Sequence, residues 1–298
     1  MPADVDADVP EQRILEQSVR LGPTGAVTGW AGCRLHGAAF FDGLAADGRT
    51  PLPVPLVTGG TTLRGDASVR VLRDQLSVDN VVVRHGIRTT RVERALFDAM
   101  RCADLREAVV AMDMAAAADL VSIRRTRHHL STRTGSRGAR RVARTLSLAD
   151  EHSRSPNETR MRLVWVLDAG LPIPLVNQPV FDCDGRLLGI VDLLDEQAGL
   201  VGEYDGADHR TAARHSSDVA REDDLRSVGL EVFRVTGPDL PVPERVVTRM
   251  RAARRRARWT PAAERRWTIE PPAWWDRPAT LDELLDERDV IMSLHDAG

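Results

Sequence analysis

The chain has 298 residues, 42% of them apolar, which is enough for two domains that each bury a core. Three cysteines without C-x-x-C spacing exclude a disulfide framework and a zinc knuckle, and they fit a reducing, cytoplasmic setting. No apolar run approaches the roughly 18 residues that span a bilayer, and the acidic start is unlike a signal peptide. We therefore expect neither membrane insertion nor export.

The charge is strongly segregated along the chain. All 41 basic residues are arginine, and the net charge is −3. Residues 121–144 hold eight arginines and no acid, and residues 245–266 hold nine arginines and one glutamate. Residues 268–298 are acidic. The net charge argues against indiscriminate polyanion binding, but the basic segments could follow a phosphate backbone. For residues 249–258, whose arginines would surround a helix, a solvated surface is the alternative.

The first half predicts mixed helices and strands. Thr28 as N-cap and Gly37 beyond the last turn predict a short helix over residues 29–36. Residues 51–80 combine Pro and Gly turns with short β-branched runs, which predicts strands joined by turns. The basic stretch 121–144 predicts a loop that leads into a helix.

Two further helices are predicted between these regions. Thr90 and Glu93 form a capping-box pattern before apolar residues at helical spacing, which predicts a helix over residues 91–101. Asp104 predicts the N-cap of a second, alanine-rich helix over residues 106–118.

The strongest local signal opens the second half. Ser155, Pro156 and Glu158 combine an N-cap serine, the favoured first-position proline and a capping-box glutamate, and the predicted helix ends at Gly170. The elements predicted to follow are strands at 175–181, 187–194 and 199–204, a helix at 217–228 and a strand at 230–235, with an Asp184-Gly185 hairpin turn after the first strand.

The helix over 217–228 is expected to face inward with Val219, Leu225 and Val228. The element order is α-β-β-β-α-β, and the fold class is α/β (α+β) with a mixed α/β N-terminal domain.

Several acids fall where a metal-dependent phosphodiesterase would need them. Asp192 lies amid apolar residues of the second strand. Glu203 and Asp205 share one face of the third strand because strand side chains alternate. His209 follows closely, and Glu158 starts the preceding helix. Converging carboxylates bind hard cations that polarise a phosphate and lower the pKa of a bound water.

Each residue also has a structural explanation. Glu158 is accounted for by a capping box, Glu203 by an ion pair with an arginine, and Asp205 by a turn before Gly206. A single histidine such as His209 is usually structural. Asp192 is harder to explain in this way, because burying an unpaired carboxylate costs several kcal/mol.

At these residues the chain from Ser155 to Thr236 resembles the Vsr-type endonucleases of the PD-(D/E)XK, or restriction-endonuclease-like, superfamily. The matching elements are Glu158, Val191-Asp192, the E-x-D-G-x-x-H run from Glu203 to His209, and the final segment from Arg221 to Thr236. The resemblance implies an αβββαβ core in which a central sheet is flanked by helices.

The resemblance also implies an activity, that of a metal-dependent DNA endonuclease in DNA repair or defence against foreign DNA. Asp192 and Glu203 would hold Mg²⁺ or Mn²⁺, Asp205 and His209 would assist water activation, and Glu158 would complete the site. The superfamily lysine two residues after the glutamate is replaced by Asp205, and His209 is expected to take over its role.

Arginines are the expected nucleic-acid contacts. The candidates are Arg221, Arg226, Arg137, Arg140 and Arg141. For the two arginines at 221 and 226, solvation or pairing with Glu222 and Asp223 is the alternative.

The N-terminal half resembles AbiEi-type antitoxin or regulator modules. The residues that carry this resemblance are Trp30 to Gly37, Gly86 to Thr90 and Glu93 to Asp98. It implies a toxin or nuclease partner protein, in addition to DNA.

Four segments are therefore expected: a regulatory or DNA-binding module over 1–120, a basic linker and helix over 121–150, a nuclease domain over 151–240, and an arginine-rich helix with an acidic tail over 241–298. Two other functions stay open. One is a non-catalytic, antitoxin-like transcriptional regulator on a nuclease scaffold. The other is a toxin or phage-defence component that acts on RNA.

Overall fold

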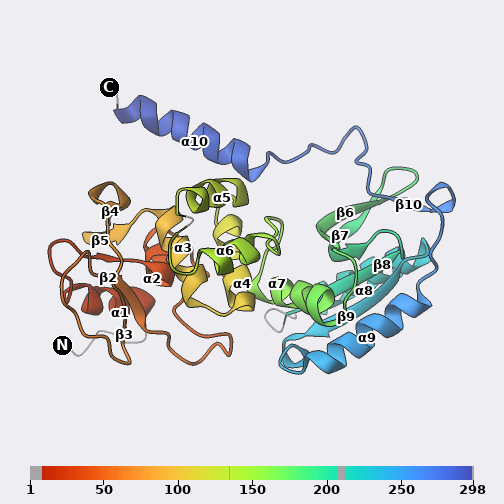
Figure 1. Cartoon of the computed structure of the whole chain (residues 1–298). Coiled ribbons are helices and arrows are strands. Elements are labelled where there is room, and N and C mark those ends of the chain that lie inside the picture. Colours follow the sequence, from red (N-terminus) through yellow and green to blue (C-terminus); the bar gives the residue numbers. More distant parts are fainter. Residues whose placement is uncertain (1–8, 134, 207–211, 297–298) are drawn as a thin grey trace. The chain divides into compact units, whose positions relative to one another are not determined.

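The computed structural model describes residues 9–133, 135–206 and 212–296, and its contacts divide the chain into two compact units (Figure 1). The first unit comprises Met1–Glu151 and Thr280–Gly298, and the second comprises His152–Ala279. Each unit contains a mixed, five-stranded sheet with helices, so the chain has the mixed α/β class expected from its sequence. No helix in the described ranges is long and apolar enough to cross a membrane.

The first unit combines a sheet with a group of helices. Its sheet has the order β3-β2-β1-β5-β4, with the β1–β5 and β2–β3 pairs parallel and the other pairs antiparallel. The elements are α1 (Pro10–Ser18), β1 (Ala26–Val27), α2 (Gly29–Leu35), β2 (Val54–Val57), β3 (Val69–Leu72), the 3₁₀ turn η1 (Val78–Asn80), β4 (Val81–Arg84), β5 (Ile87–Thr90), α3 (Val92–Cys102), α4 (Leu105–Ala117), α5 (Ile123–Ser131), α6 (Ala139–Leu146) and α10 (Leu281–Asp296).

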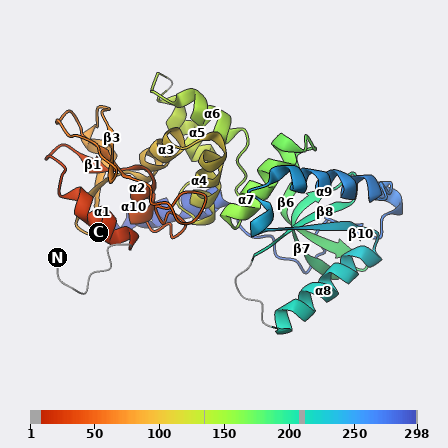
Figure 2. The same cartoon turned by 90° about the horizontal axis from the view of Figure 1, so that it is seen from below.

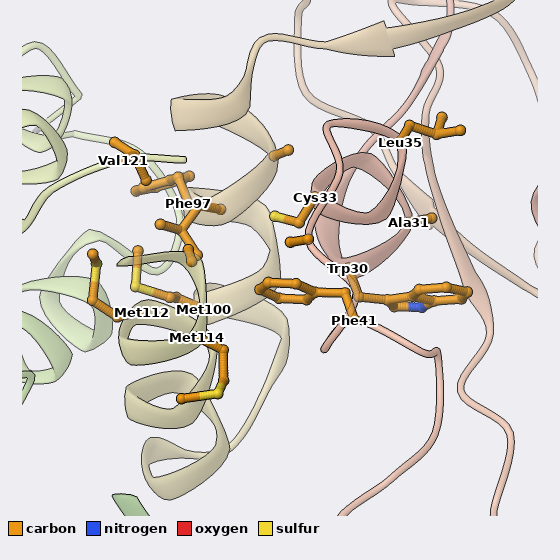
Figure 3. Close-up of a cluster of buried hydrophobic side chains, with 14 of the residues drawn as sticks. Trp30, Ala31, Cys33, Leu35, Phe41, Phe97, Met100, Met112, Met114 and Val121 are labelled. Atoms are coloured by element: carbon orange, nitrogen blue, oxygen red, sulfur yellow. The ribbon is translucent and has the colours of Figure 1, made fainter. Parts of the chain in front are cut away.

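A single apolar core joins these helices to the sheet. Figure 3 shows Trp30 and Cys33 of α2 and Phe97 and Met100 of α3 in this core, together with Met112 of α4. All five side chains are buried. The apolar residues at helical spacing that predicted α3 therefore lie on the face that this helix buries.

The predicted caps in this unit are only partly right. Asp104 caps α4 by accepting the backbone N–H groups of Arg106 and Glu107, as expected. Thr28 and Thr90 precede α2 and α3 but cap neither helix. Both threonines are fully buried and their hydroxyl groups lie 3.0 Å apart, so tertiary contacts take the oxygens that the local pattern assigns to caps.

The basic stretch was expected to begin as a loop, and this prediction is wrong. Residues Ile123–Ser131 form α5, because Ser122 caps it by accepting the N–H of Arg125 and the buried Thr126 anchors it. The acidic helix α10 pairs with this helix. Arg124 contacts Asp282 at 2.7 Å, and Arg125 contacts Asp286 at 2.6 Å.

The second unit is a sheet with helices on both faces. Its strand order is β10-β6-β7-β8-β9, in which β8 and β9 are parallel and the other pairs are antiparallel. The elements are α7 (Pro156–Leu163), the π-helical turn η2 (Val164–Asp168), β6 (Leu175–Asp182), β7 (Leu187–Asp195), β8 (Leu200–Asp205), α8 (Ala212–Ser227), β9 (Glu231–Thr236), the 3₁₀ turn η3 (Gly237–Asp239), α9 (Pro243–Arg256), the 3₁₀ turn η4 (Ala262–Glu264) and β10 (Trp267–Thr268).

Figure 2 shows α8 and α9 on opposite faces of this sheet. On one face, α9 packs through Val246 and Met250 against a core that includes Trp165 and Phe233, whose rings stack at 5.8 Å. On the other face, α8 contributes Leu225. The expected α-β-β-β-α-β order is therefore present in α7, β6, β7, β8, α8 and β9.

The cap and the turn predicted in this unit are confirmed, but one residue predicted to face inward is not. Ser155 caps α7 by accepting the N–H of Glu158 at 3.2 Å, and the turn at Gly185, with φ of 83°, joins β6 to β7. Val219 was expected to face inward, but 47% of its surface is exposed, because the apolar contact of α8 with the sheet is made by Leu225 near the end of the helix.

Candidate functional site

The second unit places two acids next to each other on its central strands. β7 and β8 pair from Asp195 opposite Leu200 to Leu193 opposite Gly202. One step further in the same register, Asp192 comes opposite Glu203. Here the Asp192 carboxylate accepts the backbone N–H of Tyr204 at 2.7 Å. The two acids, called the carboxylate pair below, therefore lie together where the ladder between the strands ends.

The pKa values of both acids of the carboxylate pair are raised. Burial raises the pKa of Glu203 to about 8, and the negative charge of Asp192 adds to the rise. Burial also raises the pKa of Asp192 to about 6, against the lowering effect of the Tyr204 N–H. The charge of Glu158 raises the Asp192 pKa further. Each acid is destabilised as an anion by burial and by its neighbours.

One cation partly compensates the charge of the pair at close range. Arg221 of α8 donates to Glu203 Oε2 at 2.8 Å and to the Ile190 carbonyl at 3.0 Å. The stem of this arginine crosses β7 at Gly189, where an added Cβ would lie 2.9 Å from Arg221 Cδ. A larger residue at position 189 would therefore displace the arginine from the glutamate.

The other oxygen of Glu203 has no donor. Glu203 is 6% exposed, and its Oε1 is buried without a hydrogen-bond partner among the described residues. Leaving a buried acceptor unpaired costs about 1–3 kcal/mol. A proton or a metal cation would satisfy this oxygen.

Glu158 is held beside the pair by the start of α7. Its Oε2 accepts the backbone N–H of Arg154 and the Asn177 side-chain amide, each at 2.9 Å. Asn177 has a φ of 46°, a left-handed conformation that asparagine tolerates better than most residues. The expected capping box is only half formed: Ser155 accepts the N–H of Glu158, but the Glu158 carboxylate accepts the N–H of Arg154 and not that of Ser155. The charge of Glu158 also acts on Asp192.

Tyr204 links the helix to the strand. Its hydroxyl accepts the Asn157 amide at 2.7 Å, and Asn157 in turn accepts from Arg160 at 2.8 Å. Asn157 and Asn177 were not predicted from the sequence. An asparagine inside a β-rich run, where its propensity is poor, was the available signal for Asn177.

Two predicted catalytic residues remain, Asp205 and His209. Asp205 ends β8 opposite Thr236 of β9 and is partly buried. His209 lies outside the described residues. Within residues 9–133, 135–206 and 212–296, no group of three or more His, Cys, Asp or Glu side chains is close enough to hold a metal ion.

Of the five arginines predicted to contact nucleic acid, two lie in the second unit and three in the first. Arg226 pairs with Glu222 at 2.7 Å, which is the alternative that the sequence left open. Arg221 instead pairs with Glu203 at 2.8 Å, which is the structural alternative given for that glutamate. Arg137, Arg140 and Arg141 are exposed in the first unit. Arg141 also donates to the Ala103 carbonyl.

Comparison with known protein families, curated proteins and solved structures gives no match to this chain.

Proposed function

We propose that the protein is a metal-dependent endonuclease that hydrolyses phosphodiester bonds of DNA, with Asp192 and Glu203 as the metal ligands. The observation that carries this proposal is the carboxylate pair, in which Glu203 Oε1 is buried with no hydrogen-bond partner in the part of the chain that the structure describes. The α-β-β-β-α-β order and the parallel pairing of β8 with β9 support a restriction-endonuclease-like core. The sequence resemblance over residues 155–236 supports the same assignment.

The donor set fits Mg²⁺ or Mn²⁺. These cations prefer carboxylate oxygens, and both acids present such oxygens. Burial raises the pKa values of Asp192 and Glu203 despite the nearby Arg221, and a divalent cation would supply further positive charge to stabilise the two anions. When bound, such a cation polarises a phosphate and lowers the pKa of a water.

The chain's own residues would orient this site. Tyr204 fixes one oxygen of Asp192 through its backbone N–H, and Arg221 fixes Oε2 of Glu203. Glu158, held by Asn177, would complete the site. Asp205 and His209 remain the proposed groups for water activation, in place of the lysine that the superfamily uses.

Nicking of supercoiled plasmid DNA by the full chain tests the proposal. We expect nicking with Mg²⁺ or Mn²⁺ that is lost in EDTA and in Asp192→Asn. Asp184→Asn, at an exposed acid of the β6–β7 turn, is the matched control and is expected to retain activity. Equal activity in Asp192→Asn would overturn the assignment. Cleavage of an RNA substrate but not of DNA would replace DNA by RNA as the substrate.

A second function is favoured by the Arg221 ion pair. Because this arginine already occupies Glu203 Oε2 and partly neutralises the pair, the same structure would serve a non-catalytic DNA-binding regulator with a toxin or nuclease partner protein. One result would distinguish this regulator from the nuclease. The regulator would bind DNA but would show no uptake of Mg²⁺ or Mn²⁺ that depends on Asp192 and Glu203.

A further inference from the structure

A hollow in the second unit lies away from the carboxylate pair, at the C-terminal end of α9. It has a volume of about 310 Å³ and is lined by Leu171, Arg251, Arg254, Arg255 and Trp259. This volume is at the lower end of the range for small-ligand sites, about 300–1,000 Å³. None of the lining residues is acidic, so the hollow favours anions.

The fold holds Trp259 in a strained conformation at this hollow. The residue has a φ of 55°, a left-handed conformation that costs a bulky side chain about 1–2 kcal/mol, and 46% of its surface is exposed. Its backbone N–H donates to the Ala198 carbonyl and its indole N–H to the Arg254 carbonyl, each at 3.3 Å. Backbone strain that holds an aromatic ring half exposed is typical of binding sites rather than of packing.

The arginines differ in how firmly they are held. Arg254 lies 4.4 Å from the centre of the Trp259 ring and donates to the buried Asp195 at 2.9 Å, which fixes the guanidinium against the indole. Arg251 donates to the Ala169 carbonyl at 3.1 Å. Arg255 is exposed and has no partner among the described residues. The hollow therefore combines a fixed aromatic surface with net positive charge, including one uncommitted cation.

We propose that this hollow binds one nucleotide unit of a single-stranded nucleic acid, with its base stacked on Trp259 and its phosphate at Arg255 and Arg251. Stacking on an aromatic ring and ion pairing with arginine are the two interactions that single-strand binding sites combine. Because every base has a flat face, binding is expected to tolerate any sequence. The proposal does not rest on the carboxylate pair, since binding requires no metal.

The test is the affinity of the full chain for a fluorescein-labelled single-stranded DNA 12-mer in EDTA, measured by anisotropy. Trp259→Gly removes the ring while allowing the positive φ, so the fold should be retained and a thermal melt checks this. We expect about tenfold weaker binding. Trp274→Gly, at a 58% exposed tryptophan outside the hollow, is expected to bind as the wild type does. Unchanged affinity in Trp259→Gly would overturn the proposal.

Arginine variants separate a local phosphate contact from diffuse attraction. Arg255→Gln is expected to weaken binding and to reduce the slope of log affinity against log salt by about 0.7, the value for one phosphate contact to a single strand. Arg245→Gln removes an exposed arginine about 15 Å away along α9 and should leave the slope unchanged. Equal losses in both variants would overturn the proposal, as would equally tight, Trp259-dependent binding of poly-glutamate.

Discussion

Each unit buries a cluster of charged side chains, and the two clusters are balanced very differently. In the first unit Asp98 is fully buried and accepts from Arg94 at 2.8 Å, from Arg101 at 2.7 Å and from Thr28 at 2.7 Å. The two arginines also pair with Asp74. In the second unit, the carboxylate pair shares Arg221 as its one close ion-pair partner among the described residues.

The difference indicates which cluster is structural. Where two arginines meet two aspartates, the buried charges compensate one another and connect α3 to Asp74 beyond β3. The carboxylate pair is undercompensated, and one of its oxygens has no donor among the described residues. Such an arrangement costs stability, and a ligand that supplies positive charge would recover it.

The largest expected effect is in the balanced cluster. Asp98→Ala should lower the free energy of unfolding of the first unit by about 3–5 kcal/mol, because two buried guanidinium groups lose their shared partner. Urea unfolding followed by far-UV circular dichroism measures this change. Asp79→Ala, at an exposed acid of the same unit, should unfold as the wild type does. A similarly mild effect for Asp98→Ala would show that the cluster is not structural.

The undercompensated pair should give the second unit an unusual pH dependence. The pKa values of Glu203 and Asp192 are raised to about 8 and about 6, so between about pH 4.5 and 8 the folded unit binds more protons than the unfolded chain. Its free energy of unfolding should therefore fall by about 2–3 kcal/mol as the pH rises through this window. The pKa values of Asp182 and Asp239 are lowered by hydrogen bonds, so these acids titrate below it.

Tryptophan fluorescence during urea unfolding reports this dependence. Five of the six tryptophans belong to the second unit, namely Trp165, Trp259, Trp267, Trp274 and Trp275. Stability that rises between pH 5 and 8 would contradict the raised pKa values.

A smaller effect is expected from removing one charge of the pair. Glu203→Gln keeps an acceptor for Arg221 but abolishes the anion, so it should raise the free energy of unfolding at pH 8 by about 1–2 kcal/mol and flatten the pH dependence. Glu196→Gln, at a partly exposed ion pair with Arg265 in the same unit, should do neither. Destabilisation by Glu203→Gln would mean that its charge is compensated in the fold.

The smallest effect concerns Glu158. Glu158→Gln can still accept from Arg154 and Asn177, so the free energy of unfolding should change by less than about 0.5 kcal/mol. Loss of the negative charge should lower the pKa of Asp192, which carboxyl ¹³C shifts follow directly. An unchanged Asp192 titration would restrict Glu158 to its hydrogen bonds with Arg154 and Asn177.

Much of the second unit was predictable because its signals are local. The cap at Ser155, the hairpin turn at Gly185 and the β-rich runs that follow α7 were enough to predict the element order. An acid between apolar strand residues also identified Asp192 as unusual.

The features that the sequence did not predict depend on contacts between residues that are distant in the sequence. Thr28 and Thr90 look like caps but bond to each other across 62 residues, and nothing local shows that Arg221 reaches Glu203 across Gly189. The hollow at Trp259 likewise depends on Asp195 at the end of β7 and on Ala198 in the turn that follows, both distant from Trp259 in the sequence.

The most direct test of the carboxylate pair as a metal site is calorimetric titration of the full chain with Mn²⁺. We predict uptake by the wild-type protein and by Asp184→Asn, and loss of that uptake in Asp192→Asn and in Glu203→Gln. Mn²⁺ uptake that persists unchanged in both variants, or no uptake by the wild-type protein, would contradict the account.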